Sequence, residues 1–368
     1  MIQMGVLLPG VSAQPVPAQV LTSDSSERWL VFEILEQADL DPEYLFTQWG
    51  EPASGPAVDN LSEGYRRPVL WLRLALVNPE TQVQERWLTF TNPLLDRITV
   101  EQRDADGQRR TYRTGEHWRG EAGSEPVILS SVRLALAPGE TRVLIRVETE
   151  AAMATRVALL YRASFQRVLD LHALKAAVVV ACQLVAAIAA LIVAVLMRSR
   201  LWRAFAIFAV GNGVVFAHLF GYLSWWFDAG GSDWPDRLGA IAFAVALVAG
   251  VEFTARAIGL YATRPVLFTR SMMDLIVLAL CALLAVSLGW TALSIEALLG
   301  LALIASAVML YALTARTLHR RKVGPFLTAG IVLHLGFLWP VSFAIWVICP
   351  AFGGPRRCTN SPRLSTSR

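Results

Sequence analysis

The chain has 368 residues, of which 55% are hydrophobic and 17% charged, and its formal net charge is +4. Soluble proteins average about 25% charged residues, so the composition excludes an ordinary soluble domain along the whole chain. Most arginines of the second half flank apolar segments, where they report membrane orientation, and we therefore expect no nucleic-acid partner.

The N-terminus combines a short apolar run with the small residues Val11, Ser12 and Ala13, which suit a secretory cleavage site. The positively charged region that normally precedes such a run is missing. We expect residues 1–18 to be a clipped signal peptide, and a plain flexible terminus is the alternative.

Residues 19–168 have the pattern of an all-β domain. In the segment 69–76, leucines at 70, 72, 74 and 76 share one face of a strand, while Trp71 and Arg73 share the other. Further strands are expected at 86–91, 97–102, 127–136, 141–148 and 156–163, with turns at 104–107 and 137–140. Many short strands without helical periods predict an extracytoplasmic sandwich or jelly roll.

This domain carries no recognisable catalytic motif, so we expect no enzyme activity. Aromatic side chains beside polar donors suit sugars and other polar ligands. The candidate ligand-binding residues are Trp71, Arg73, Tyr112, His117 and Trp118. The alternative for each is structural, with Trp71 covering the second face of the sandwich and Trp118 filling a loop.

Residues 169–348 contain a series of apolar segments that approach or exceed the about 20 residues needed to span a bilayer. They predict an α-helical transmembrane bundle. The six segments are 172–197, 204–227, 238–261, 272–290, 294–314 and 325–348.

Loop charges orient these helices. Arginines follow the first, third and fifth segments, whereas the loop at 228–236 is acidic and the loop at 291–294 is uncharged. Because positive loops lie in the cytoplasm, the β-domain is expected outside, in the periplasm of a bacterial inner membrane. Trp225, Trp226, Trp234 and Trp290 form the expected aromatic belt at the outer ends.

Six helices would leave the C-terminus outside, yet the tail at 349–368 holds arginines and no acid. We expect this tail to be disordered or out of frame. Cys182 and Cys281 lie within apolar segments, Cys349 and Cys358 lie in the tail, and none precedes the first segment. We therefore expect neither a disulfide in the β-domain nor a zinc motif, and no cofactor.

Polar residues inside the helices are candidates for a relay, because a charge in lipid is costly. Glu252 has Arg256 four residues later, a spacing that favours an ion pair. Alternatively, Glu252 and His334 lie at a similar depth and would form a proton-sensitive latch. His218, nearer the outside, is the remaining candidate.

Several sequence blocks carry a resemblance to a known family. They are Leu61-Ser62-Glu63-Gly64-Tyr65, Trp71-Leu72-Arg73, Asn78-Pro79, Asn92-Pro93-Leu94-Leu95-Asp96-Arg97, Thr114-Gly115-Glu116 and Leu136-Ala137-Pro138-Gly139-Glu140-Thr141. With the helices that follow, the chain resembles bacterial seven-transmembrane receptors with diverse intracellular signalling modules (7TMR-DISM), carrying their type 2 extracellular domain.

The resemblance implies a carbohydrate-binding-like jelly roll whose ligand state passes through the helices to a cytoplasmic kinase, cyclase or phosphatase. The sequence shows only six of seven expected helices and no output motif. We therefore expect a C-terminally truncated receptor or its sensor fragment.

The leading functional hypothesis is a membrane sensor that binds a small extracytoplasmic ligand, carbohydrate-like in character. Its expected partners are the lipid bilayer, a second copy in a homodimer, and a cytoplasmic or membrane signalling protein. The alternative is a transporter with an extracytoplasmic binding domain, although no inverted repeat is evident. A membrane enzyme would need acids or histidines clustered at one membrane face, and the sequence shows none.

Overall fold

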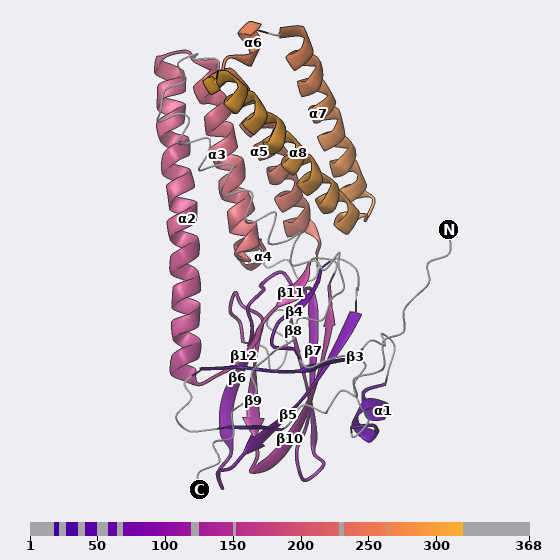
Figure 1. The fold of residues 1–368 in the computed structure, drawn as a ribbon. Helices are drawn as coiled ribbons and strands as arrows, with labels where there is room; N and C mark the ends of the chain where they lie inside the picture. The colour runs from indigo at the N-terminus through magenta and orange to yellow at the C-terminus, as the bar shows by residue number, and fades with distance from the viewer. Residues whose placement is uncertain are drawn as a thin grey trace, which may run out of the picture.

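The computed structural model places a β-sheet domain at one end of a bundle of long helices (Figure 1). The residues that it describes are 18–21, 27–35, 41–49, 58–64, 69–118, 125–149, 152–227, 232–263 and 265–318. Within these residues the predicted order of parts, a β-domain followed by membrane-length helices, is confirmed.

Two main sheets form the β-domain. The larger has six strands in the order β1-β5-β10-β7-β8, with β3 also paired to β5. Its strands are β1 (Gln19–Val20), β3 (Glu33–Leu35), β5 (Val69–Asn78), β7 (Arg97–Arg103), β8 (Arg109–Thr114) and β10 (Gly139–Glu148). The smaller has the order β2-β12-β6-β9, formed by β2 (Glu27–Trp29), β6 (Gln84–Phe90), β9 (Ser131–Leu136) and β12 (Val157–Leu160). A separate pair joins β4 (Leu61–Gly64) to β11 (Met153–Thr155).

The core lies between the two main sheets, as expected for a sandwich. One buried cluster takes leucines at 70, 72, 74 and 76 from β5, leucines at 134 and 136 from β9, and Leu88 and Phe90 from β6. The predicted alternation along β5 is therefore confirmed. The jelly-roll topology stays a prediction.

The outer face of β5 is not exposed to solvent. Helix α1 (Pro42–Thr47) packs Leu45 and Phe46 over Trp71 and over Leu144 of β10. Asp41 caps this helix, because its carboxylate accepts a hydrogen bond from the Glu43 backbone N–H at 3.0 Å. Central strands of the larger sheet are consequently covered on both faces.

The predicted strand at 156–163 ends early, at Leu160, and helix α2 (Arg162–Leu196) begins after a single intervening residue. The first turns of α2 pack on the β-domain, where Phe165 stacks on Trp87 with ring centroids 5.7 Å apart. The helical region thus starts earlier than residue 169. Strand β8 was not expected, because its Arg-Arg-Thr-Tyr-Arg-Thr sequence shows little apolar alternation.

Five helices in the described part of the chain are long and apolar enough to cross a membrane. They are α2, α3 (Arg200–Leu219), α5 (Trp234–Ala257), α7 (Pro265–Ser287) and α8 (Thr291–Leu318), with short α4 (Tyr222–Phe227) and α6 (Leu260–Thr263) between them. The first five predicted segments are confirmed. The sixth, 325–348, and the tail lie outside the described residues.

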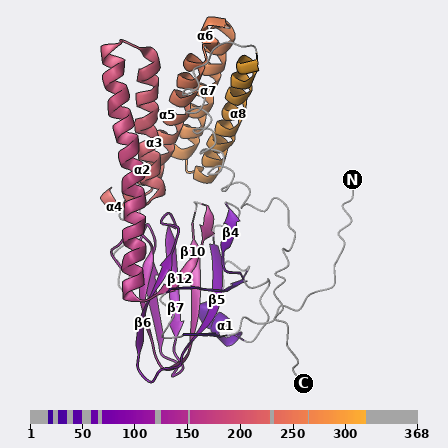
Figure 2. The ribbon, with the colours of Figure 1, turned by 60° about the vertical axis from the view of Figure 1, so that its left-hand side comes forward.

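Small residues let the helices approach closely, as in other membrane bundles. A Cβ at Gly211 of α3 would lie 3.1 Å from the Ala246 Cβ of α5, and one at Gly250 of α5 would lie 3.0 Å from the Phe208 ring. Successive helices α2, α3 and α5 therefore pack side by side, with α7 and α8 beyond them (Figure 2).

The two ends of the bundle differ as the loop charges predict. The turn between α2 and α3, with Arg198, and short α6 lie at the end away from the β-domain (Figure 1). Trp225, Trp226 and Trp234 lie around the connection between α4 and α5 at the opposite end, and each is at least 45% exposed. This arrangement places the β-domain on the side opposite the arginine-rich loops.

Candidate functional site at the junction

The β-domain contacts the helices through a small set of loops and helix ends, which we call the junction. It comprises residues 91–96 and 115–118 of the β-domain and residues 218–224 and 233–236 of the helices. Ser224 of α4 donates a hydrogen bond to the Glu116 carboxylate, and both residues are buried. On α2, His172 Nε2 lies 2.9 Å from the Phe220 carbonyl oxygen.

The β-domain side of the junction depends on a glycine. Gly115 has φ +126°, and a Cβ there would lie 2.5 Å from the Asp96 carbonyl oxygen. This close approach lets the backbone N–H groups of Glu116 and His117 donate to the carbonyl oxygens of Leu95 and Asp96, at 2.8 and 2.9 Å. His117 is thereby held beside Asp96.

A second glycine shapes the helix side. Gly221, between α3 and α4, has φ +79°, and a Cβ there would lie 2.7 Å from the Cβ of Pro93. Asn92 fixes that loop, because its side-chain oxygen accepts from the Leu94 backbone N–H at 3.0 Å. The α3–α4 turn therefore rests directly on the Asn92-Pro93 loop.

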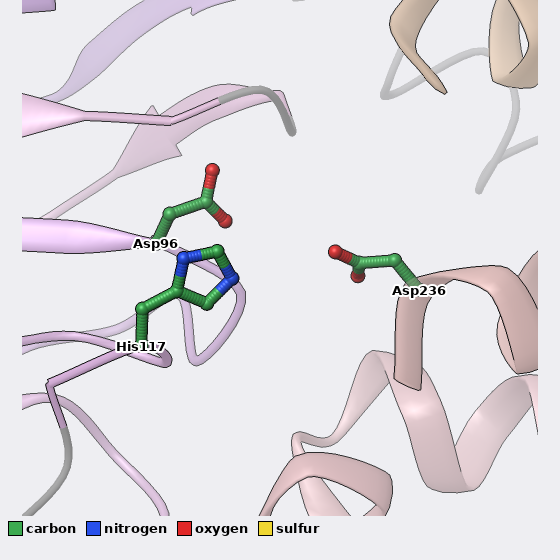
Figure 3. Close-up of side chains that lie close together, drawn as sticks. All are labelled: Asp96, His117 and Asp236. Atoms are coloured by element: carbon green, nitrogen blue, oxygen red, sulfur yellow. The ribbon is translucent and has the colours of Figure 1, made fainter. Parts of the chain in front are cut away.

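Three potential metal ligands meet at the junction. Figure 3 shows Asp96 and His117 on the β-domain facing Asp236 on the first turn of α5. One ligand atom from each side chain lies within 4.8 Å of the others. Asp96 is buried, and the His117 and Asp236 side chains are 12% and 23% exposed.

Further polar groups surround these three. His117 Nε2 lies 3.9 Å from a carboxylate oxygen of Asp233, and His218 Nε2 lies 3.6 Å from one of Asp236. Gly239 makes room for the second contact, because a Cβ there would lie 2.5 Å from the His218 ring. Neither ring nitrogen of His117 has a hydrogen-bond partner among the described residues.

The predicted ligand-binding residues are not brought together. Trp71 is only 2% exposed because α1 covers it, which agrees with the structural alternative, and its role in ligand binding stays a prediction. Arg73 beside it is also buried, and its guanidinium lies 2.5 Å from the Glu33 carboxylate. Tyr112 packs on the sandwich core, with its hydroxyl 3.3 Å from Gln102 Oε1.

His117 and Trp118, in contrast, lie at the junction. Trp118 is partly exposed, and the guanidinium groups of Arg97 and Arg113 lie 5.8 and 5.3 Å from its ring centroid. A half-exposed indole between two cations can stack on a polar ring or bind an anionic group. Ligand binding by these residues stays a prediction.

The predicted Glu252–Arg256 ion pair is confirmed within α5. The carboxylate of Glu252 also accepts a hydrogen bond from the Tyr261 hydroxyl on α6, a contact that was not predicted. The proposed latch partner His334 lies outside the described residues, and His218 lies at the outer end of α3 as expected.

Asp96, Glu116, Ser224 and Asp236 were not among the predicted site residues. Asp96 and Glu116 belonged to the blocks that carried the family resemblance, and this was their only signal. Asp236 was taken only as part of an acidic loop. Their meeting depends on how the β-domain sits on the bundle, which no local spacing encodes.

Comparison with known proteins bears on the first half of the chain. Residues 24–160 match the family model described as 7TMR-DISM extracellular 2. A search of curated proteins gives no match. The matched region covers nearly all of the β-domain and ends at the last residue of β12, directly before α2.

Proposed function

Since residues 24–160 form a 7TMR-DISM type 2 extracellular domain, and membrane-length helices follow, we propose that this membrane receptor binds a carbohydrate-like ligand and relays its state through the helices. The ligand would bind in the periplasm, and the helices would cross a bacterial inner membrane. An output module at the cytoplasmic ends of the helices would respond to the ligand-induced change in helix packing.

The direct attachment of the sensor domain to the helices is the observation that carries this proposal. Only Tyr161 separates β12 from α2, and Glu116 and Ser224 hydrogen-bond across the junction. A ligand shifts a conformational equilibrium only if it binds the two states with different affinity. A domain fixed at several points to α2 and α4 would transmit such a shift, whereas a flexible linker would absorb it.

The ligand class is supported by Trp118. Its ring is half-buried and flanked by Arg97 and Arg113, a combination that offers both a stacking face and hydrogen-bond donors. Sugars present apolar ring faces and many acceptor oxygens, so this surface fits them better than it fits a purely apolar ligand.

The test uses the full chain in lipid nanodiscs and a panel of neutral and acidic oligosaccharides. Spin labels are attached at Asp106 in the β-domain and Ser199 at the far end of the bundle, both after exchange to cysteine in a chain cleared of its own cysteines. We expect at least one oligosaccharide to raise the unfolding temperature and shift the distance distribution between the labels. Binding without any change in distance would contradict the relay.

The same panel separates a receptor from a transporter. Proteoliposomes that contain the full chain should not accumulate a radiolabelled form of the bound oligosaccharide. Uptake driven by an ion gradient would replace the receptor proposal with the transporter alternative.

A further inference from the structure

We propose that Asp96, His117 and Asp236 form a binding site for a divalent transition-metal cation, with Zn²⁺ as the best-fitting ion, that links the β-domain to α5. The site itself does not depend on the receptor function. A regulatory role for the cation rests on the proposed function: in a receptor, a cation at the junction would stabilise one packing of the sensor domain on the helices.

The ligand set has the chemistry of a zinc site. One imidazole nitrogen and two carboxylate oxygens are available, all within 4.8 Å of one another. Zinc sites that keep an open position use three such protein ligands and one water. The imidazole disfavours Mg²⁺ and Ca²⁺, which prefer ligand sets made only of oxygen.

The burial of His117 supports a bound cation. Both ring nitrogens of His117 are shielded from solvent and have no hydrogen-bond partner in the described structure. A buried polar group without a partner costs about 1–3 kcal/mol, and a coordinated cation would supply the partner. The nearest ion-pair partner, Asp233, is 62% exposed and lies 3.9 Å away.

The surrounding charges also favour a cation. Carboxylates of Asp96, Asp233 and Asp236 converge on His117, while the nearby cation Arg237 is directed to Asp233 at 3.8 Å. A divalent ion would offset the repulsion between these acids. His218 is the neighbour that would orient the Asp236 ligand, since its Nε2 lies 3.6 Å from that carboxylate.

Coordination would tighten the junction. Zinc bonds of about 2.0–2.1 Å in tetrahedral geometry place two ligand atoms about 3.4 Å apart. Asp96 and His117 are fixed to each other through the Gly115 turn, whereas Asp236 belongs to a separate element. The bound ion would therefore hold the start of α5 against the β-domain.

The test uses the purified full chain in nanodiscs. Bound metal is removed with EDTA and dialysis, and zinc is then titrated back to measure its stoichiometry and affinity. We expect one zinc per chain, and a zinc affinity at least tenfold weaker in Asp236→Asn and in His117→Asn. Asp106→Asn is the matched control, because this exposed aspartate lies in a turn outside the junction and its loss should leave zinc affinity unchanged. Zinc should also raise the unfolding temperature of the unaltered chain but not that of Asp236→Asn.

Asp236→Asn keeps the proposal falsifiable if His117→Asn fails to fold, since Asp236 lies on a partly exposed helix surface. Failure to retain zinc, or equal zinc affinity in Asp236→Asn and the unaltered chain, would overturn the site. Zinc stoichiometry does not require a sugar ligand or any relay. Failure of the receptor proposal would therefore leave this result unchanged, and loss of the site would leave the receptor proposal standing.

Discussion

Ser224 donates a hydrogen bond to Glu116, a residue 108 positions earlier in the sequence, and so joins α4 to the β-domain. Because both side chains are buried, removing the hydroxyl leaves a buried carboxylate with one partner fewer. We expect Ser224→Ala to lower the free energy of unfolding by about 1–3 kcal/mol, measured by thermal unfolding in detergent. Ser287→Ala is the control, because that exposed hydroxyl bonds only to the Leu284 carbonyl oxygen in its own helix. Equal effects of the two variants would contradict the importance of the contact.

Gly239→Ala should disturb the packing of α3 on α5. The added methyl group would lie 2.5 Å from the His218 ring, which must then move away from Asp236. Overpacking of this kind costs about 1–3 kcal/mol, visible as a lower unfolding temperature. Gly300→Ala provides the comparison, because nothing lies within 4 Å of the position its methyl group would take. A stable Gly239→Ala protein would show that the two helices are not closely packed there.

Trp71→Ala and Trp118→Ala should have different effects. Trp71 is 2% exposed beneath α1, and its truncation should cost about 3–5 kcal/mol of stability. Trp118 is partly exposed, so its truncation should preserve the unfolding temperature and weaken oligosaccharide binding. Circular dichroism and binding isotherms on the full chain distinguish the two effects. A folded Trp71→Ala protein without ligand binding would instead support Trp71 as a ligand contact.

The buried pair of Arg73 and Glu33 offers a double-variant test. The two side chains are 6% and 5% exposed, so Glu33→Gln would leave the arginine without its buried countercharge. Breaking such a pair costs about 3–5 kcal/mol, whereas replacing both members with apolar residues is often neutral. We expect the double variant Glu33→Met/Arg73→Met to be more stable than Glu33→Gln by chemical denaturation. The reverse order would mean that the pair itself stabilises the sheet.

Sidedness can be tested with single cysteines introduced at Asp106 and at Ser199. Asp106 lies in the β-domain, and Ser199 lies in the arginine-flanked turn between α2 and α3. In bacterial cells with a permeabilised outer membrane, a membrane-impermeant maleimide should label the cysteine at 106 and not the one at 199. Labelling at 199 alone would invert the orientation.

The sequence predicted the features that repeat along the chain. Long apolar runs located the first five helices, and leucines at alternate positions of β5 identified the core face. Trp71 was harder to place, because its environment comes from α1, a short helix that lies elsewhere in the sequence. Alternation shows which residues share a face but does not show what covers that face.

The junction could not be predicted for a related reason. Asp96, His117 and Asp236 belong to three separate segments, and their proximity depends on how the domain docks on the helices. Periodicity reports local structure only. The glycines at 115, 221 and 239 each permit another segment to pack closely against the backbone. Which segment packs there can be seen only in the folded structure.

Helix α2 has 35 residues, which corresponds to about 52 Å at 1.5 Å per residue, whereas the hydrocarbon core of a bilayer is about 30 Å thick. The excess length runs alongside the β-domain, where Phe165 stacks on Trp87. The β-domain is therefore attached to the bundle through the first turns of α2, with only Tyr161 between β12 and that helix. A rotation of the domain about the membrane normal would therefore also rotate the outer end of α2.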